Sequence, residues 1–225
     1  MNRIKKHTAH LIVLVLICVK SSVGVEKSKK HDWKLGVQTA SFHLFTFQEA
    51  IDKTAELGLS YAEFYYGQKL GGDMEGTMDF RMDEAKQKKI LAYAKSKNVK
   101  LIASGVVICK DEAEWEQLFK FANYMDIKAI TCEPDYECLK YIDELANKYN
   151  IDVPIHNHPK PSNYRKPEMF LKAVEGLSNR IGACADVGHW KRVGLDPVKG
   201  LKKYEGRLKS LHFKDVKEKE EGEAE

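Results

Sequence analysis

Short, continuous apolar runs alternate along this chain with longer stretches in which apolar residues recur at helical spacing. The continuous runs predict buried strands of a parallel sheet that is covered on both faces, because such strands show no polar alternation. The longer stretches predict amphipathic helices, such as the one that contains Phe47, Ile51 and Ala55 and ends at Gly58. The predicted strands are Lys34–Thr39, Tyr61–Tyr66, Lys100–Val107, Ala129–Glu133, Asp152–His156, Ile181–Asp186 and Leu208–Phe213.

The alternation of strand and helix predicts a single α/β domain. Successive strands start about 30 residues apart, the length of one βα unit. This pattern suits a TIM (β/α)₈-type barrel or a doubly wound open sheet. No G-x-G-x-x-G turn follows the first strand, which disfavours a dinucleotide-binding open sheet. We predict an incomplete TIM barrel of about seven βα units, because no eighth strand is visible before the charged run at Lys217–Glu225.

The longest connection in the predicted fold runs from Gly67 to about Asp83. Beyond Gly67 it contains three more glycines, at positions 71, 72 and 76. A long connection that follows a strand is a common place for a segment that covers substrate. We expect a loop of this kind here.

The first 24 residues predict a secretory signal peptide. Three basic residues open the segment: Arg3, Lys5 and Lys6. The apolar run Leu11–Val19 that follows is too short for a stable membrane span. Cleavage near Val25 would leave residues 25–225 as one exported domain, periplasmic or secreted, with a charged tail at 217–225. A lipoprotein anchored at Cys18 is less favoured, because Ile17 stands where a small residue is needed.

The net charge argues against a nucleic-acid partner, and the cysteine spacing argues against a zinc knuckle or a disulfide-rich fold. The net charge of +4 is small and its basic residues are dispersed among acids, so we expect no nucleic-acid partner. Four cysteines lie outside the predicted signal: Cys109, Cys132, Cys138 and Cys184. Their spacing fits neither a zinc knuckle nor a dense disulfide framework. A bridge between Cys132 and Cys138 is open, but we expect buried thiols.

Imidazole and carboxylate groups stand at the ends of the later predicted strands. His156 and His158 lie two residues apart, so their side chains project from one face. They could ligate one metal together, or they could be loop histidines near Pro159 and Pro161. Glu133 likewise ends the strand before them, immediately ahead of a proline.

Two further strand ends carry similar groups. Asp186 and His189 form D-x-x-H, where Asp186 needs a cationic partner at the end of a buried strand. Alternatively, Asp186 caps the following helix. His212 ends the last strand, and Lys214 projects from the same face, either to stabilise an enolate or as a solvated lysine. Glu63, at the end of the second strand, could be structural.

Ligands at the carboxyl ends of successive parallel strands are typical of a barrel enzyme with its site on that face. Imidazole nitrogen and carboxylate oxygen bind divalent metals such as Zn²⁺ and Mn²⁺. We therefore predict one divalent metal, Mn, Zn or Mg, with the ligands Glu133, His156, Asp186 and His212. The predicted catalytic residues are His158, His189 and Lys214.

Five segments resemble the xylose-isomerase-like barrel superfamily, in its sugar phosphate isomerase/epimerase branch. They are LGVQTASF, AIDKTAELGLSYAEF, IDVPIHNHP, IGACADVGHW and GRLKSLHFKDV, and the resemblance runs from about Lys34 to about Val216. Similar proteins are (β/α)₈ barrels that bind one divalent metal and act on sugars or keto-sugars. DNA-repair endonucleases share the fold, but a nuclease function fits poorly with basic residues that are dispersed among acidic ones.

The resemblance also implies roles for individual residues. Asp186 and His212 match the metal ligands of strands six and seven, and His189 matches a histidine that faces substrate or metal. His156, with His158 beside it, stands where the epimerases have a glutamate that is both ligand and base. No residue matches the glutamate that the epimerases carry on strand eight.

Together these features predict a metal-dependent isomerase or epimerase, or a keto-glycoside lyase, that removes a proton next to a carbonyl of a sugar or keto-sugar. His156, His158 or Glu133 would move the proton. Export favours substrates that are not phosphorylated. The alternative is a non-catalytic or truncated sugar-binding barrel, and a homo-oligomer is compatible with either. Six aromatic residues are weaker candidates for stacking on sugar: Phe42, Phe45, Tyr65, Tyr66, Tyr164 and Trp190.

Overall fold

Seven parallel strands form the central sheet, in the order β1-β2-β5-β6-β7-β8-β9. The computed structural model describes residues 33–214 and residue 216. The predicted signal peptide, Asp215 and the predicted tail at 217–225 lie outside the described residues. The chain divides into residues 1–33, of which only Trp33 is described, and residues 34–225, which contain all the helices and strands considered below.

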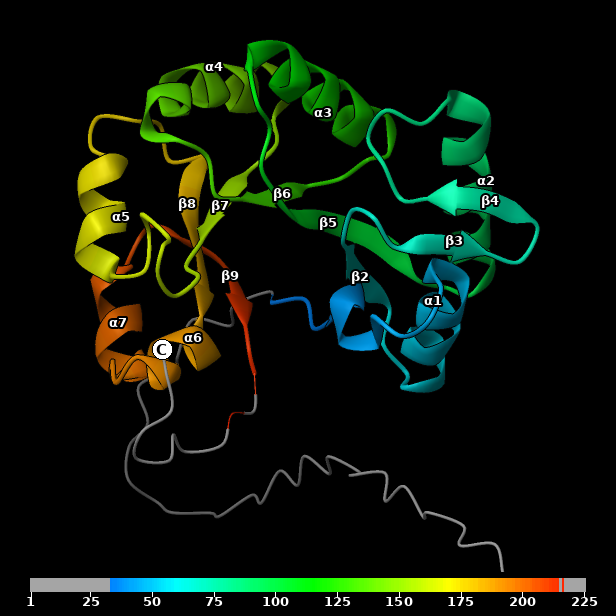
Figure 1. Ribbon diagram of the computed structural model, residues 1–225, viewed down its shortest axis with the longest axis horizontal. Helices are drawn as coiled ribbons and strands as arrows, with labels where there is room; N and C mark the ends of the chain where they lie inside the picture. Colours follow the sequence, from blue (N-terminus) through cyan, green and yellow to red (C-terminus); the bar gives the residue numbers. More distant parts are fainter. Residues whose placement is uncertain (1–32, 215, 217–225) are drawn as a thin grey trace, which may run out of the picture. The chain divides into compact units, whose positions relative to one another are not determined.

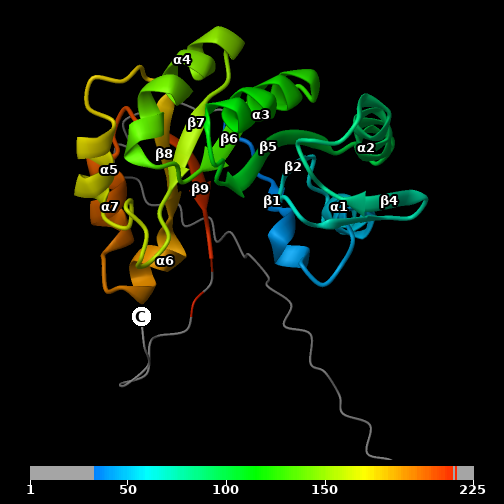
Figure 2. The ribbon, with the colours of Figure 1, turned by 45° about the horizontal axis from the view of Figure 1, so that its top comes forward.

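The sheet curves into an incomplete TIM barrel, with helices along its outer side (Figures 1 and 2). Its strands are β1 Val37–Gln38, β2 Tyr61–Phe64, β5 Lys100–Val107, β6 Ala129–Cys132, β7 Val153–His156, β8 Ile181–Asp186 and β9 Leu208–His212. The helices are η1 Thr39–Phe42, α1 Phe47–Glu56, α2 Glu84–Ser96, α3 Glu112–Tyr124, η2 Tyr136–Cys138, α4 Leu139–Tyr149, α5 Pro167–Ala173, α6 Val187–Arg192 and α7 Pro197–Lys203.

All seven predicted strands are present, and the predicted fold class is confirmed. β1 is shorter than predicted, at two residues. β8 is buried along its whole length, as a continuous apolar run in a doubly covered sheet predicts. β9 instead is half-buried at every residue and is the last strand of the sheet within the described residues.

The long connection after β2 is not a simple loop. It contains an antiparallel hairpin, β3 Lys69–Gly71 and β4 Met74–Thr77, which forms a sheet of its own. The hairpin packs on the start of α1: a Cβ added at Gly71 would lie 2.4 Å from Thr46 Oγ1. The sequence predicted a long connection here but not this hairpin, in which Leu70, Met74 and Met78 are buried and fix the segment to the domain.

Cys109, Cys132, Cys138 and Cys184 are free thiols, three of them buried, as the sequence predicts. Within residues 33–214, no helix combines the length and apolar character that a bilayer crossing requires.

Candidate metal centre

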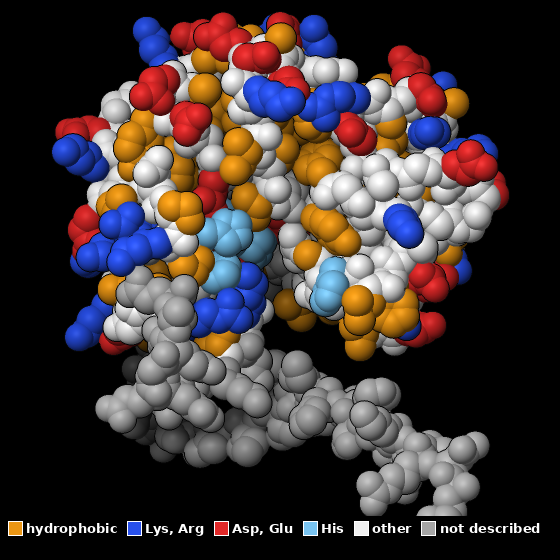
Figure 3. Space-filling view, in the orientation of Figure 1, with side chains coloured by type: hydrophobic (Ala, Val, Ile, Leu, Met, Phe, Trp, Pro, Cys, Tyr) orange, Lys and Arg blue, Asp and Glu red, His pale blue; other side chains and the backbone are white. Residues whose placement is uncertain are grey.

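Four neighbouring parallel strands bring polar groups to one edge of the sheet. Glu133 follows β6 directly, while His156, Asp186 and His212 are the last residues of β7, β8 and β9. β6 to β9 are sequential neighbours with parallel register, so their carboxyl ends meet. Figure 3 shows histidine side chains gathered in a hollow of the surface, with basic side chains beside them.

Asp186 lies at the centre of this group, and its side chain is fully buried. Its Oδ1 accepts a hydrogen bond of 2.9 Å from the backbone N–H of His189 and so caps α6. Its Oδ2 faces the site, 3.3 Å from His156 Nε2, 3.6 Å from His189 Nε2 and 2.6 Å from Lys214 Nζ. Asp186 therefore does both things that the sequence suggested: Oδ1 caps the following helix, and Oδ2 has a cationic partner in Lys214.

Asn157 holds the end of β8 in place. Its side-chain Nδ2 donates to the carbonyl of Asp186 at 3.0 Å, and its Oδ1 accepts from the backbone N–H of Asp186 at 2.8 Å. Asn157 is buried. Asn157 was not among the predicted site residues, although an amide between two histidines at a strand end is a usable signal in the sequence.

Glu133 binds the two histidines of the next strand end. Its Oε1 accepts from His156 Nδ1 at 3.0 Å and from the backbone N–H of His158 at 3.2 Å, and it also contacts His158 Nδ1. Burial acts to raise the pKa of Glu133, but the bonds from His156 and His158 outweigh it and lower this pKa to about 2. Glu133 is therefore ionised at neutral pH.

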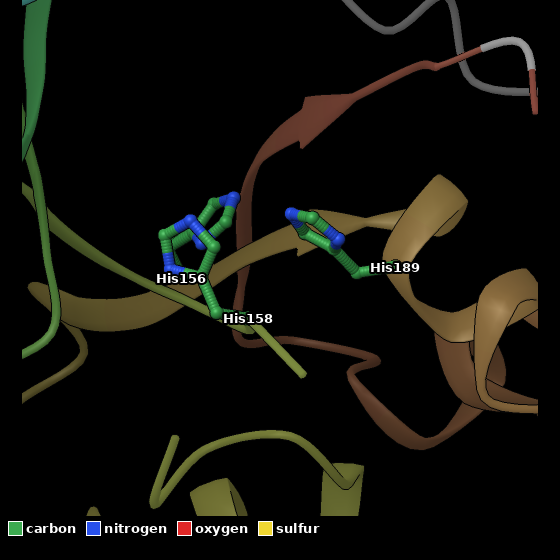
Figure 4. Close-up of side chains that lie close together, drawn as sticks. All are labelled: His156, His158 and His189. Carbon is green, nitrogen blue, oxygen red and sulfur yellow. The ribbon is translucent and has the colours of Figure 1, made fainter. Parts of the chain in front are cut away.

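Three imidazole rings lie close together in the site (Figure 4). The ring centroids of His156 and His158 are 4.2 Å apart, and that of His189 lies 5.6 Å and 5.0 Å from them. Burial, followed by the charge of Lys214, lowers the pKa of His189 to about 4 against the opposing effect of Asp186. His189 is thus neutral at pH 7, and its Nε2 accepts a 3.0 Å hydrogen bond from Lys214 Nζ.

His212 reaches the site from the last strand. Its Nδ1 lies 3.9 Å from Asp186 Oδ2, and its Nε2 lies 2.9 Å from Oε2 of Glu63 on β2. Burial lowers the pKa of His212, but Cys184 and the Glu63 carboxylate outweigh burial and hold this pKa above its usual value. Glu63, which the sequence left as a structural possibility, therefore belongs to the site.

Two sets of side chains have ligand atoms that all lie within 4.8 Å of one another: His156, Asp186 and His212, and His156, His158 and His189. The donor types suit a divalent ion. The Lys214 ammonium already stands beside Asp186 Oδ2 and His189 Nε2, so a positive charge fits there. Glu133, a predicted ligand, is in neither set and is instead bound by His156 and His158.

Two of the aromatic residues proposed for sugar stacking lie in the core instead. Trp190 is fully buried and Tyr164 is 2 % exposed. Trp190 packs against Tyr204, and Tyr164 packs against Tyr136 with its hydroxyl donated to the Pro134 carbonyl. The prediction was wrong for these two because their rings fill space between helices and strands.

Comparison with known proteins agrees with the fold. Residues 51–224 match the model of the xylose isomerase-like TIM barrel family. The chain belongs to this family. No curated protein sequence matches it significantly.

The chain is also similar to several solved structures. The chain is 41% identical to an uncharacterized protein from Parabacteroides distasonis, with 82% of this chain and 76% of that one covered and a TM-score of 0.73. A 3-keto-D-glucoside 4-epimerase from E. coli is 12% identical, over 81% and 79% of the chains, with a TM-score of 0.61. A xylose isomerase-like barrel from Mycobacterium smegmatis in complex with magnesium is 10% identical, over 82% and 75%, with a TM-score of 0.65. The last two show a shared fold.

Proposed function

We propose that this protein is a metal-dependent enzyme that isomerises or epimerises a sugar or keto-sugar, or eliminates from a keto-glycoside, by removing a proton next to a carbonyl. One observation carries this proposal: His156, Asp186 and His212, from three adjacent strands, converge with ligand atoms within 4.8 Å. These three residues would hold the ion. A divalent metal bound there supplies Lewis-acid polarisation of a carbonyl and a neighbouring hydroxyl.

Glu133 and His158 are arranged for proton transfer. The carboxylate contacts Nδ1 of His158 and so fixes the tautomer whose Nε2 carries a lone pair. A carboxylate that orients an imidazole in this way is a recurring device for general-base catalysis. His158 is also the most accessible histidine of the cluster, with its side chain 46% exposed. We assign the base to His158 and its orientation to Glu133.

His189 and Lys214 form a second pair beside Asp186. Lys214 donates to His189, and its side chain is 40% exposed, so the ammonium can reach a bound substrate. A positive charge at this point would stabilise the negative oxygen that develops when the proton leaves. His189, neutral at pH 7, can accept or return a proton.

The substrate class rests on the comparisons. A 3-keto-D-glucoside 4-epimerase is among the solved structures that share this fold. Proton removal beside a ketone is a first step that sugar isomerases, epimerases and lyases have in common. If residues 1–24 direct export as the sequence predicts, a free or keto sugar is the better substrate than a sugar phosphate.

Metal content of the purified protein tests the proposal first. We expect near-stoichiometric Mn, Zn or Mg after incubation with each ion, and loss of that metal in an Asp186→Ala, His212→Ala double variant. The matched control is Asp73→Ala, His43→Ala, which removes the same residue types at exposed positions outside both ligand sets. The control should keep its metal.

Deuterium uptake then tests the chemistry without a choice of product. Keto-sugars incubated with the metal-loaded protein in D₂O should gain deuterium at the carbon next to the carbonyl, and His158→Ala should slow this by about 10²–10⁴-fold. If the unaltered chain binds no metal under any condition, the proposal of a metal-dependent enzyme is refuted, and the alternative of a sugar-binding barrel remains.

A further inference from the structure

Glu63 points into the interior of the incomplete barrel. Its strand neighbours Ala62 and Phe64 are fully buried on the other face of β2, among the core residues. The Glu63 side chain is 12% exposed, and its Oε2 lies 2.9 Å from His212 Nε2. Its Oε1 is buried and has no hydrogen-bond partner among the described residues.

This contact spans the barrel. β2 and β9 are separated in the sheet by β5, β6, β7 and β8, and the two residues are 149 positions apart in the chain. Glu63 and His212 meet only because the sheet curves until its early and late strands face each other (Figure 1). The pair is therefore a product of the fold rather than of local sequence.

The contact with Glu63 determines which nitrogen of the His212 ring carries the hydrogen and which one faces Asp186. An ionised carboxylate can only accept hydrogen bonds, so His212 Nε2 must carry the hydrogen at the 2.9 Å contact. The ring then presents its other nitrogen, Nδ1, toward Asp186 Oδ2. A carboxylate behind a metal-binding histidine commonly fixes the ring orientation and makes the ligand more basic.

Glu63 itself lies outside the ligand group. Neither set of mutually close ligand atoms among residues 33–214 includes it, whereas His212 belongs to one of them. We infer that Glu63 is a positioning residue, which holds Nε2–H of His212 so that Nδ1 faces the metal site from across the barrel. The ring orientation is a property of the chain alone; its effect on metal binding rests on the proposed function.

NMR of the metal-free protein tests the ring orientation. With ¹⁵N-labelled histidine, the unaltered chain should show an imidazole N–H signal at Nε2 of His212 that is protected from solvent exchange. Glu63→Ala should broaden or remove that signal, and Glu63→Gln, whose amide oxygen still accepts, should keep it in part. Glu75→Ala, at an exposed position of β4, should leave it unchanged. An unchanged signal in Glu63→Ala would overturn the inference.

Metal affinity provides the second measurement. Titration against a competing chelator should show binding about 10–100-fold weaker in Glu63→Ala, with a smaller loss in Glu63→Gln. Thermal unfolding of each variant identifies any that fail to fold. If Glu63→Ala fails to fold, the isosteric Glu63→Gln variant takes its place in both measurements. Equal affinity in both variants and the unaltered chain would contradict the inferred role. If the unaltered chain binds no metal, the proposed function fails while the NMR result still decides the orientation of His212.

Discussion

Lys214 places a positive charge against the carboxylate that a metal would also bind. Its Nζ lies 2.6 Å from Asp186 Oδ2 and 3.0 Å from His189 Nε2. Lys214→Met should therefore destabilise the metal-free protein by about 1–2 kcal/mol, because the buried carboxylate loses a charged partner. The same change should tighten divalent metal binding, since the ammonium no longer competes for these atoms.

Urea unfolding with and without metal measures both effects of Lys214→Met. The variant should gain more stability from added metal than the unaltered chain does. Lys191→Met, an exposed position on α6, is the matched control and should behave as the unaltered chain. Weaker metal binding in Lys214→Met would show that the lysine assists the ion instead of competing with it.

Single residues of the site differ in how far the sequence predicts them. His156, Asp186 and His212 can be found because each ends an apolar run, and parallel strands gather their ends at one edge. The role of Glu63 depends on its contact with His212, 149 residues away, and on how strongly the sheet curves. No local pattern encodes that curvature, so the pairing emerges only in three dimensions.

Packing between helices α6 and α7 depends on one glycine. A Cβ added at Gly200 of α7 would lie 2.7 Å from Cζ3 and 2.9 Å from Cε3 of Trp190, whose ring is fully buried. Alanine favours helix by up to about 1 kcal/mol over glycine. At this position the steric cost of the contact with Trp190 should exceed the gain in helix propensity. We therefore expect Gly200→Ala to lower the free energy of unfolding by about 1–3 kcal/mol. Chemical denaturation measures this change.

The control for Gly200→Ala is Lys202→Ala, an exposed position in the same helix that should change stability by less than about 0.5 kcal/mol. Because α6 also contains His189, displacement of the Trp190 ring should weaken metal binding in Gly200→Ala alone. A stabilised Gly200→Ala would mean that α7 can move away from Trp190 without loss.

Helices and strands follow the hydrophobic pattern where they are long enough to show it. The continuous run Leu101–Ala103 marks β5, and Gly58 ends α1 with a positive φ of 71°. The β3–β4 hairpin was not predicted, because its two strands are three and four residues long and rich in glycine. Such short strands are fixed by packing against α1, which local sequence does not reveal.

The last described strand of the central sheet, β9, lies at its edge and is less protected than the strands inside that sheet. β9 is half-buried at each residue and pairs with β8 alone among the described strands, while β8 is fully buried. The proposed ligands belong to β7, β8 and β9. A bound ion would therefore join the edge strand to its two inner neighbours through bonds that do not depend on the backbone ladder.

Hydrogen exchange should show this coupling between metal and edge strand. At metal concentrations near 100 times the Kd, stability rises by about 2.7 kcal/mol, and exchange in β9 should slow by up to about 100-fold. Amides of β5 that exchange through large-scale opening should slow by the same factor, because that opening also releases the ion. Amides of the β3–β4 hairpin, outside the site, should change least where they exchange by local opening that keeps the ion bound. His212→Ala should retain exchange in β9 at the metal-free rate, since that strand then supplies no ligand. Unchanged exchange in β9 of the unaltered chain after metal is added would instead mean that β9 opens without releasing the ion.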